Sequence, residues 1–68
     1  MPYVNIRITR DGTTPAQKQR LIEGTTQLLK DVLDKDPGTT FVVIDEVATE
    51  DWGWKGKTVK ALREEPQS

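Results

Sequence analysis

The chain has 68 residues, ten basic and eleven acidic side chains, a net charge of −1, and neither cysteine nor histidine. This composition excludes disulfides and the common zinc sites, and without a basic stripe we expect no nucleic-acid partner. A chain of about 60 residues buries only roughly 60% of its unfolded surface, so we expect one domain, residues 1–68, that gains buried area as a homo-oligomer. Neither a bilayer-spanning apolar stretch nor a signal-peptide pattern is present, which predicts no membrane association and a cytoplasmic location.

Residues 3–9, YVNIRIT, predict the first β-strand. Val4, Ile6 and Ile8 alternate with other residues, so one face of the strand meets a core. Pro2 comes directly before this strand, although proline has no backbone N–H for a sheet. One explanation is that chain termini are often poorly ordered. The other is that removal of Met1 leaves Pro2 as a free secondary amine.

Pro2 is the candidate catalytic residue, because a free amine can take up a proton. An α-amino group has an ordinary pKa of about 7.7–8.0, and an apolar pocket or nearby cations favour its neutral, basic form. The chain has neither a Ser/His/Asp arrangement nor a phosphate-binding glycine loop, so these common catalytic motifs are excluded. Asp45 and Glu46 are neighbours on a predicted strand, so they point to opposite faces and cannot act as a facing pair.

An amphipathic helix is predicted from Pro15 to about Asp34. Thr14 and Gln17 have the spacing of a capping box, and Pro15 suits the first helical position. Gly24 either marks a close approach or is a tolerated defect. The predicted end is Asp36-Pro37-Gly38, where a helix cannot continue. The apolar residues recur at helical spacing, namely Leu21, Ile22, Leu28, Leu29, Val32 and Leu33.

A second strand is predicted over residues 39–47, TTFVVIDEV, with apolar residues on both faces. Strand, helix and strand form a βαβ unit, which is expected to have parallel strands and a right-handed crossover. The fold class is therefore α+β. One helix covers only one face of this sheet, so we expect the other face to meet a partner subunit.

The last third of the chain is less regular. Trp52 and Trp54 flank Gly53, which predicts a short glycine-assisted hairpin, and Val59 and Leu62 anchor a last short element. Residues 63–68 are expected to form a polar tail that frays. The two tryptophans either wall a dry pocket or bury area at a subunit interface.

The segments MPYVNIRIT, PAQKQRLIEGTTQLLKDVL, TTFVVIDEV and DWGWKGK together resemble the 4-oxalocrotonate tautomerase family, over residues 2 to about 63. The resemblance implies a βαβ subunit with a C-terminal hairpin, assembled as a dimer or a trimer of dimers. It implies that Pro2 is a general base that moves a proton between carbons of an unsaturated keto or enol acid, a small-molecule substrate. It implies neither a metal nor an organic cofactor, and it places Trp52 at the pocket wall.

Two departures from the family pattern concern the substrate. Family members often carry one arginine in the loop after the first strand and another near the start of the second strand, where they bind carboxylate and stabilise the enolate. Here Arg10 is a displaced candidate for the first, and Phe41 stands in place of the second. Lys55 or Lys57 is an alternative source of charge, and Arg7 and Arg10 also fit ordinary surface arginines. The departures argue against 2-hydroxymuconate more than against proton transfer.

Three hypotheses about function therefore remain. The first is a tautomerase with Pro2 as base. The second is a hydratase or dehalogenase of unsaturated acids that uses a protonated Pro2 as acid. The third is a catalytically silent oligomeric scaffold, which a retained Met1 favours, because Pro2 is then an amide without basicity.

Overall fold

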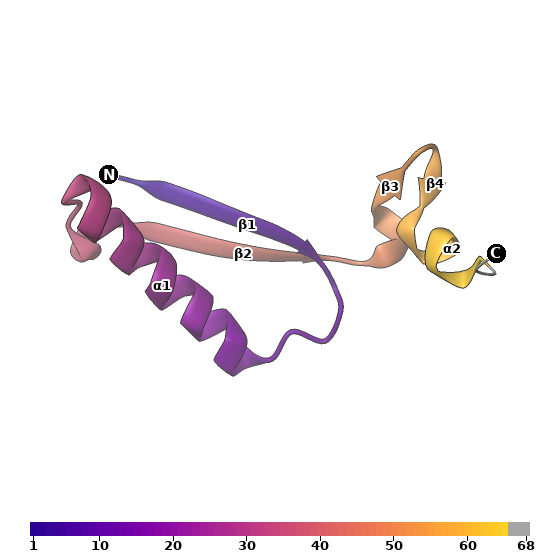
Figure 1. Cartoon of the computed structure of the whole chain (residues 1–68), viewed down its shortest axis with the longest axis horizontal. Helices are drawn as coiled ribbons and strands as arrows, with labels where there is room; N and C mark the ends of the chain where they lie inside the picture. The colour runs from indigo at the N-terminus through magenta and orange to yellow at the C-terminus, as the bar shows by residue number, and fades with distance from the viewer. Residues whose placement is uncertain (66–68) are drawn as a thin grey trace.

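A computed structural model of the chain describes residues 1–65, and Figure 1 shows its elements. Strand β1 (Tyr3–Thr9) leads to helix α1 (Pro15–Leu33), strand β2 (Phe41–Val47), a hairpin and a short final helix. The hairpin consists of β3 (Gly53–Trp54) and β4 (Lys57–Thr58), and the final helix is α2 (Val59–Glu64). The α+β class, the βαβ unit and the C-terminal hairpin predicted from the sequence are confirmed.

The βαβ unit consists of two parallel strands and the helix that connects them. The strands pair in register from Tyr3 opposite Phe41 to Thr9 opposite Val47. The capping box is confirmed, since the Gln17 backbone N–H donates to Thr14 Oγ1 at 3.1 Å and the Thr14 N–H donates to Gln17 Oε1 at 2.9 Å. Helix α1 therefore begins at Pro15, and it lies across one face of the two strands (Figure 1).

The second strand begins two residues later than predicted, because a capped turn precedes it. Asp36 accepts the Gly38 backbone N–H at 2.9 Å on its carboxylate, and Pro37–Thr39 form a turn of 3-10 helix. The hydroxyls of Thr39 and Thr40 donate to the Asp36 carbonyl at 3.2 and 2.9 Å. Both threonines thus serve the turn, and β2 starts at Phe41.

The C-terminal unit is the predicted hairpin followed by helix α2. The two turn residues, Lys55 and Gly56, have φ angles of 54° and 78°, as a tight two-residue hairpin turn requires. Thr58 caps α2 by accepting the Ala61 backbone N–H at 3.1 Å. This helix extends through Arg63 and Glu64, so the prediction that the polar tail starts at residue 63 is wrong. Residues 66–68 lie outside the described part of the chain.

Residues 1–65 form an elongated unit without a buried core. Its radius of gyration is 15.9 Å, whereas a compact domain of this length has about 11 Å. None of the described residues is fully buried, and Tyr3, Phe41 and Val43 remain exposed on the sheet face that α1 leaves open. Gly24 has no atom within 4 Å of a hypothetical Cβ, so no close approach within the chain explains it. No helix in residues 1–65 is long and apolar enough to cross a membrane.

Candidate active site

Pro2 is held at the corner where β1 and β2 begin. Its carbonyl accepts the Phe41 backbone N–H at 2.9 Å, which extends the strand pairing by one step beyond Tyr3. Pro2 itself is half-buried, whereas Met1 is 86% exposed. The backbone of Pro2 is therefore held by the sheet, while the preceding residue, Met1, is exposed to solvent. With Met1 in place the Pro2 nitrogen is an amide, and without Met1 it is an amine.

Phe41 is the only other predicted site residue at this corner. It is 51% exposed and lies in register with Tyr3, so two aromatic side chains share one sheet face beside the start of both strands. Neither carries a charge at neutral pH. The surroundings of Pro2 within one chain are therefore apolar and aromatic on this face.

Arg10 and Trp52 lie at the opposite end of the sheet. Arg10 directly follows β1, and its backbone N–H donates to the Val47 carbonyl at 2.8 Å. Trp52 follows β2 at the same end, is half-buried, and accepts the Val59 N–H on its carbonyl at 2.7 Å. At about 3.3 Å per strand residue, Pro2 and Arg10 lie about 25 Å apart. One chain thus places Pro2 beside Phe41 at one end of the sheet, and Arg10 and Trp52 at the other end. There the Arg10 side chain faces Glu46, whereas Trp52 lines a groove with Arg7.

Glu46 links Arg10 to the helix. Its carboxylate lies 2.7 Å from Lys18 Nζ through Oε1 and 3.9 Å from Arg10 Nε through Oε2. Oε1 is inaccessible to solvent and has no aligned hydrogen-bond donor among residues 1–65, so the Lys18 contact there is an ion pair. Sequence reasoning did not single out Glu46 as a partner of Arg10, although strand alternation already placed it on the α1 side.

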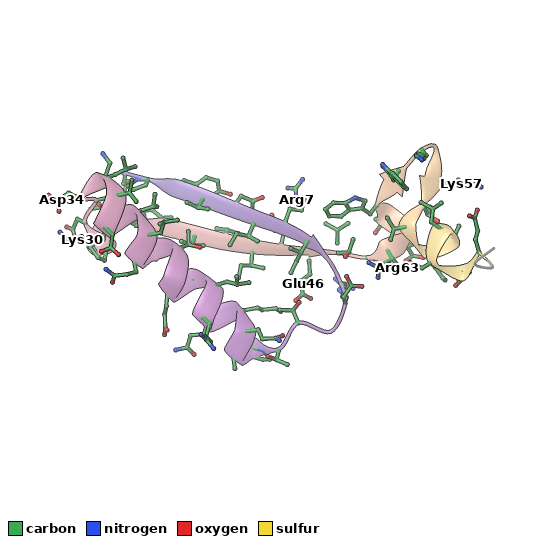
Figure 2. All side chains as sticks on the ribbon, in the orientation of Figure 1. Arg7, Lys30, Asp34, Glu46, Lys57 and Arg63 are labelled. Atoms are coloured by element: carbon green, nitrogen blue, oxygen red, sulfur yellow. The ribbon has the colours of Figure 1, made fainter. Side chains whose placement is uncertain are left out.

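The neighbouring Asp45 serves the other sheet face. It accepts a hydrogen bond from Asn5 Nδ2 at 2.7 Å and pairs with Arg7 at 3.6 Å. Figure 2 shows Arg7 on the side away from α1 and Glu46 on the side toward it. The prediction that Asp45 and Glu46 point to opposite faces is confirmed, and Arg7 is an ion-paired arginine on the uncovered face.

A second arginine pair fastens the C-terminal unit to the loop after β1. Arg63 donates from both terminal nitrogens to the two carboxylate oxygens of Asp11, and the Thr9 hydroxyl also donates to Asp11. The hydrogen bonds from Arg63, followed by that from Thr9, lower the pKa of Asp11 below its ordinary value, and Asp11 raises the pKa of Arg63. The sequence carries no local signal for this contact, since the partners are 52 positions apart.

The two tryptophans and the two hairpin lysines, Lys55 and Lys57, lie in different surroundings. Trp52 lines a shallow groove together with Arg7, Val47, Asp51 and Gly53. Trp54 is exposed at the hairpin, with Lys55 Nζ 4.4 Å from its ring centre. Lys57 is paired with Glu65 at 2.7 Å. Of the two tryptophans, Trp52 is therefore the one in a hollow, as expected for a pocket wall.

No metal-binding cluster of His, Cys, Asp or Glu occurs in the part of the chain that the structure describes. The chemistry available at the two ends is that of an N-terminal nitrogen, an arginine held by a carboxylate, and aromatic walls. An amine at Pro2, which forms only once Met1 is removed, is a group that takes up and returns a proton, and an arginine is a group that binds carboxylates.

Comparison with known proteins gives consistent matches over nearly the whole chain. The model of the family described as tautomerase enzyme matches residues 2–62. Probable tautomerase K2 of Dickeya dadantii (strain 3937) is 57% identical over 65 residues, which are 96% of this chain and 97% of that protein. The crystal structure of DmpI from Helicobacter pylori superposes with a TM-score of 0.83 at 39% identity and covers 96% of this chain and 100% of that chain. An asymmetric trimer of a fused 4-OT gives a TM-score of 0.79 at 34% identity over 88% of this chain and 49% of that chain.

Proposed function

The chain belongs to the tautomerase family, and we propose that it is a keto–enol tautomerase that acts on an enol or unsaturated 2-keto acid. In this proposal Pro2, freed of Met1, is the general base. It removes the proton of the enol hydroxyl, the C=O bond forms as the electron pair of the C=C bond shifts to carbon, and the protonated amine returns the proton at that carbon. Arg10 binds the carboxylate, while Phe41 and Trp52 form apolar walls.

The observation that carries the proposal is the placement of Pro2. The Phe41 N–H fixes its carbonyl at 2.9 Å, so the nitrogen of a mature Pro2 is held at the corner of a sheet instead of on a loose tail. A base on a rigid element keeps its geometry relative to the substrate better than one on a loop. The exposure of Met1 supports the required processing, because a cleaving enzyme can reach it.

A complete site needs residues from more than one subunit, so we propose a homo-oligomer. Two copies of a strand edge that are related by a two-fold axis run antiparallel, so the start of one strand lies beside the end of the other. This arrangement brings Pro2 and Phe41 of one subunit close to Arg10 and Trp52 of its partner. The absence of a sealed core in residues 1–65 and the trimeric state of the fused 4-OT relative support an assembly, dimeric or a trimer of dimers.

The apolar surroundings also bear on the state of the base. Tyr3 and Phe41 beside Pro2 supply no negative charge that favours a protonated amine. Closure by a partner's Trp52 removes water, which further favours the neutral amine. Arg10, brought near the amine, acts in the same direction through its positive charge. A role in the degradation of aromatic compounds is a further expectation that the family resemblance implies, and a cytoplasmic location stays a prediction from the sequence.

The experiment that tests the proposal compares the wild type with Pro2→Ala. We expect the wild type to convert phenylenolpyruvate or 2-hydroxymuconate and the variant to lose about 10²–10⁴-fold in rate, the usual contribution of a general base. Intact-mass spectrometry of native material accompanies the assay, and we expect a mass one methionine residue below the full chain. Equal rates for the two proteins, with Met1 absent from both, contradict the proposal.

A further inference from the structure

We propose that Glu46 is a positioning residue that holds the guanidinium of Arg10 with its terminal nitrogens turned to a substrate carboxylate. This inference rests on the proposed function, since it takes Arg10 as the residue that binds the acid. It adds a specific role in acid binding for Glu46, to which the proposed function assigns none.

Glu46 stands where the end of β2, the first turns of α1 and the loop after β1 come together. Its side chain is only 18% exposed, and its two oxygens face different cations, Lys18 on the helix and Arg10 after β1. Figure 2 shows Glu46 pointing from the sheet toward this junction. A partly buried carboxylate needs compensating charge, and here two elements supply it.

The two contacts differ in strength. Lys18 Nζ lies 2.7 Å from Oε1, whereas Arg10 Nε lies 3.9 Å from Oε2. Lys18 is therefore the main counter-ion of Glu46, and Arg10 is held at the limit of an ion pair. The group of one anion and two cations carries one net positive charge, which remains on the exposed Arg10 and is available to an incoming carboxylate.

The atom of Arg10 that meets Glu46 also matters. The contact runs through Nε and not through the fork of terminal nitrogens, on a side chain that is 63% exposed. That fork is the part of arginine that binds a carboxylate through two parallel hydrogen bonds. The hydrogen bond to the Val47 carbonyl fixes the Arg10 backbone but not its side chain. The contact with Glu46 limits the rotation of that side chain.

A simpler explanation is that Glu46 only joins α1 to β2 through Lys18. That role predicts a change in stability, which is the same whether or not Arg10 is present. The positioning role predicts a change in acid binding that vanishes when Arg10 is removed. A double-mutant cycle between the two residues separates these explanations.

The experiment measures binding of cinnamate, an unreactive monocarboxylate with an aryl group, by titration calorimetry. The proteins are the wild type, Glu46→Gln, Arg10→Ala and the double variant, each with Met1 removed. We expect Glu46→Gln to weaken binding about three- to five-fold, the range of a partly exposed ion pair. In the Arg10→Ala background we expect the same substitution to change the dissociation constant less than about twofold.

Asp45→Asn is the matched control, because it removes the adjacent carboxylate of β2, which pairs with Arg7 on the other face at 3.6 Å. We expect its dissociation constant for cinnamate to stay within about twofold of the wild type. Where Glu46→Gln does not fold, Glu46→Asp retracts the same charge from Arg10 and is expected to weaken binding in the same direction. Thermal unfolding and gel filtration verify that each variant folds.

The outcomes keep this inference apart from the proposed function. The positioning role is overturned if Glu46→Gln binds cinnamate as tightly as the wild type, or if Glu46→Gln weakens binding equally with and without Arg10. It is also overturned if cinnamate binding does not depend on Arg10. None of these depends on turnover. The proposed function is instead contradicted by equal rates for the wild type and Pro2→Ala. In that case the double-mutant cycle of cinnamate binding can still be measured.

Discussion

Arg63 of α2 donates two hydrogen bonds to the carboxylate of Asp11 in the loop after β1, although the two residues are 52 positions apart in the chain. Through this pair the C-terminal unit, residues 53–64, is held beside the end of the sheet at which β1 and β2 finish (Figure 1). The pair therefore connects the orientation of the hairpin with the loop that presents Arg10. It is a contact between surface groups, so its effect is on local order more than on global stability.

We predict that this link opens only in acid or when Arg63 is replaced. The pKa of Asp11 is lowered by the hydrogen bonds from Arg63 and Thr9, so their stabilisation is present above the ordinary value of 3.8 and is lost as the pH falls through the lower folded value. Hydrogen exchange of residues 53–64, corrected for intrinsic rates, is expected to be constant from neutral pH to about pH 5 and to rise well below pH 4.

In Arg63→Gln, the same residues are expected to exchange faster already at neutral pH. Lys60→Gln is the control, because it removes an exposed positive charge from the same helix α2 and leaves the pair of Arg63 with Asp11 in place. Equal exchange in Arg63→Gln and the wild type at neutral pH contradicts a fastening role for the Asp11 pair.

A pH–rate profile distinguishes proline as base from proline as acid. A tautomerase with Pro2 as base requires the neutral amine, so kcat/KM for phenylenolpyruvate is expected to rise with pH through the pKa of that amine and then level off. A hydratase or dehalogenase that uses protonated Pro2 shows the reverse slope with its own substrate. A profile that falls as the amine loses its proton argues for the acid role.

Phe41→Arg is predicted to change which acids the site prefers. Phe41 lies next to Pro2 and in register with Tyr3, and its side chain carries no charge. An arginine there adds a fork for a second carboxylate, so the ratio of kcat/KM for 2-hydroxymuconate to that for phenylenolpyruvate is expected to rise about tenfold. Phe41→Leu is the control, because it shortens the side chain without adding charge. An equal change in both variants means that shape, not charge, sets the preference.

The sequence predicted the elements well, because each has a local signal. The Thr14 and Gln17 capping box, the alternation in residues 3–9 and the glycines of the hairpin act over a few residues. The strand start was misplaced because the Asp36 side chain and two threonine hydroxyls form a turn, which strand propensity does not reveal.

The site was harder to predict, because it depends on contacts between distant segments. Glu46 with Lys18 and Arg10, and Asp11 with Arg63, join residues whose proximity follows only from the packing of α1, the sheet and α2. The resemblance supplied Pro2, Arg10, Phe41 and Trp52 as one set. The register shows instead that a single chain divides them between two ends of the sheet.

This division leads to a prediction about mixed oligomers. If each site combines Pro2 of one subunit with Arg10 of another, then a dimer of one Pro2→Ala subunit and one Arg10→Ala subunit regains activity at one of its sites. After unfolding and refolding an equal mixture, half of the dimers contain one subunit of each kind, and one of their two sites has both residues intact. We therefore expect about a quarter of the wild-type rate at low substrate concentration, where both parent proteins are weak. A mixture in which the double variant Pro2→Ala/Arg10→Ala replaces one partner is the control, and activity no higher than the mean of the parents indicates a site built within one chain.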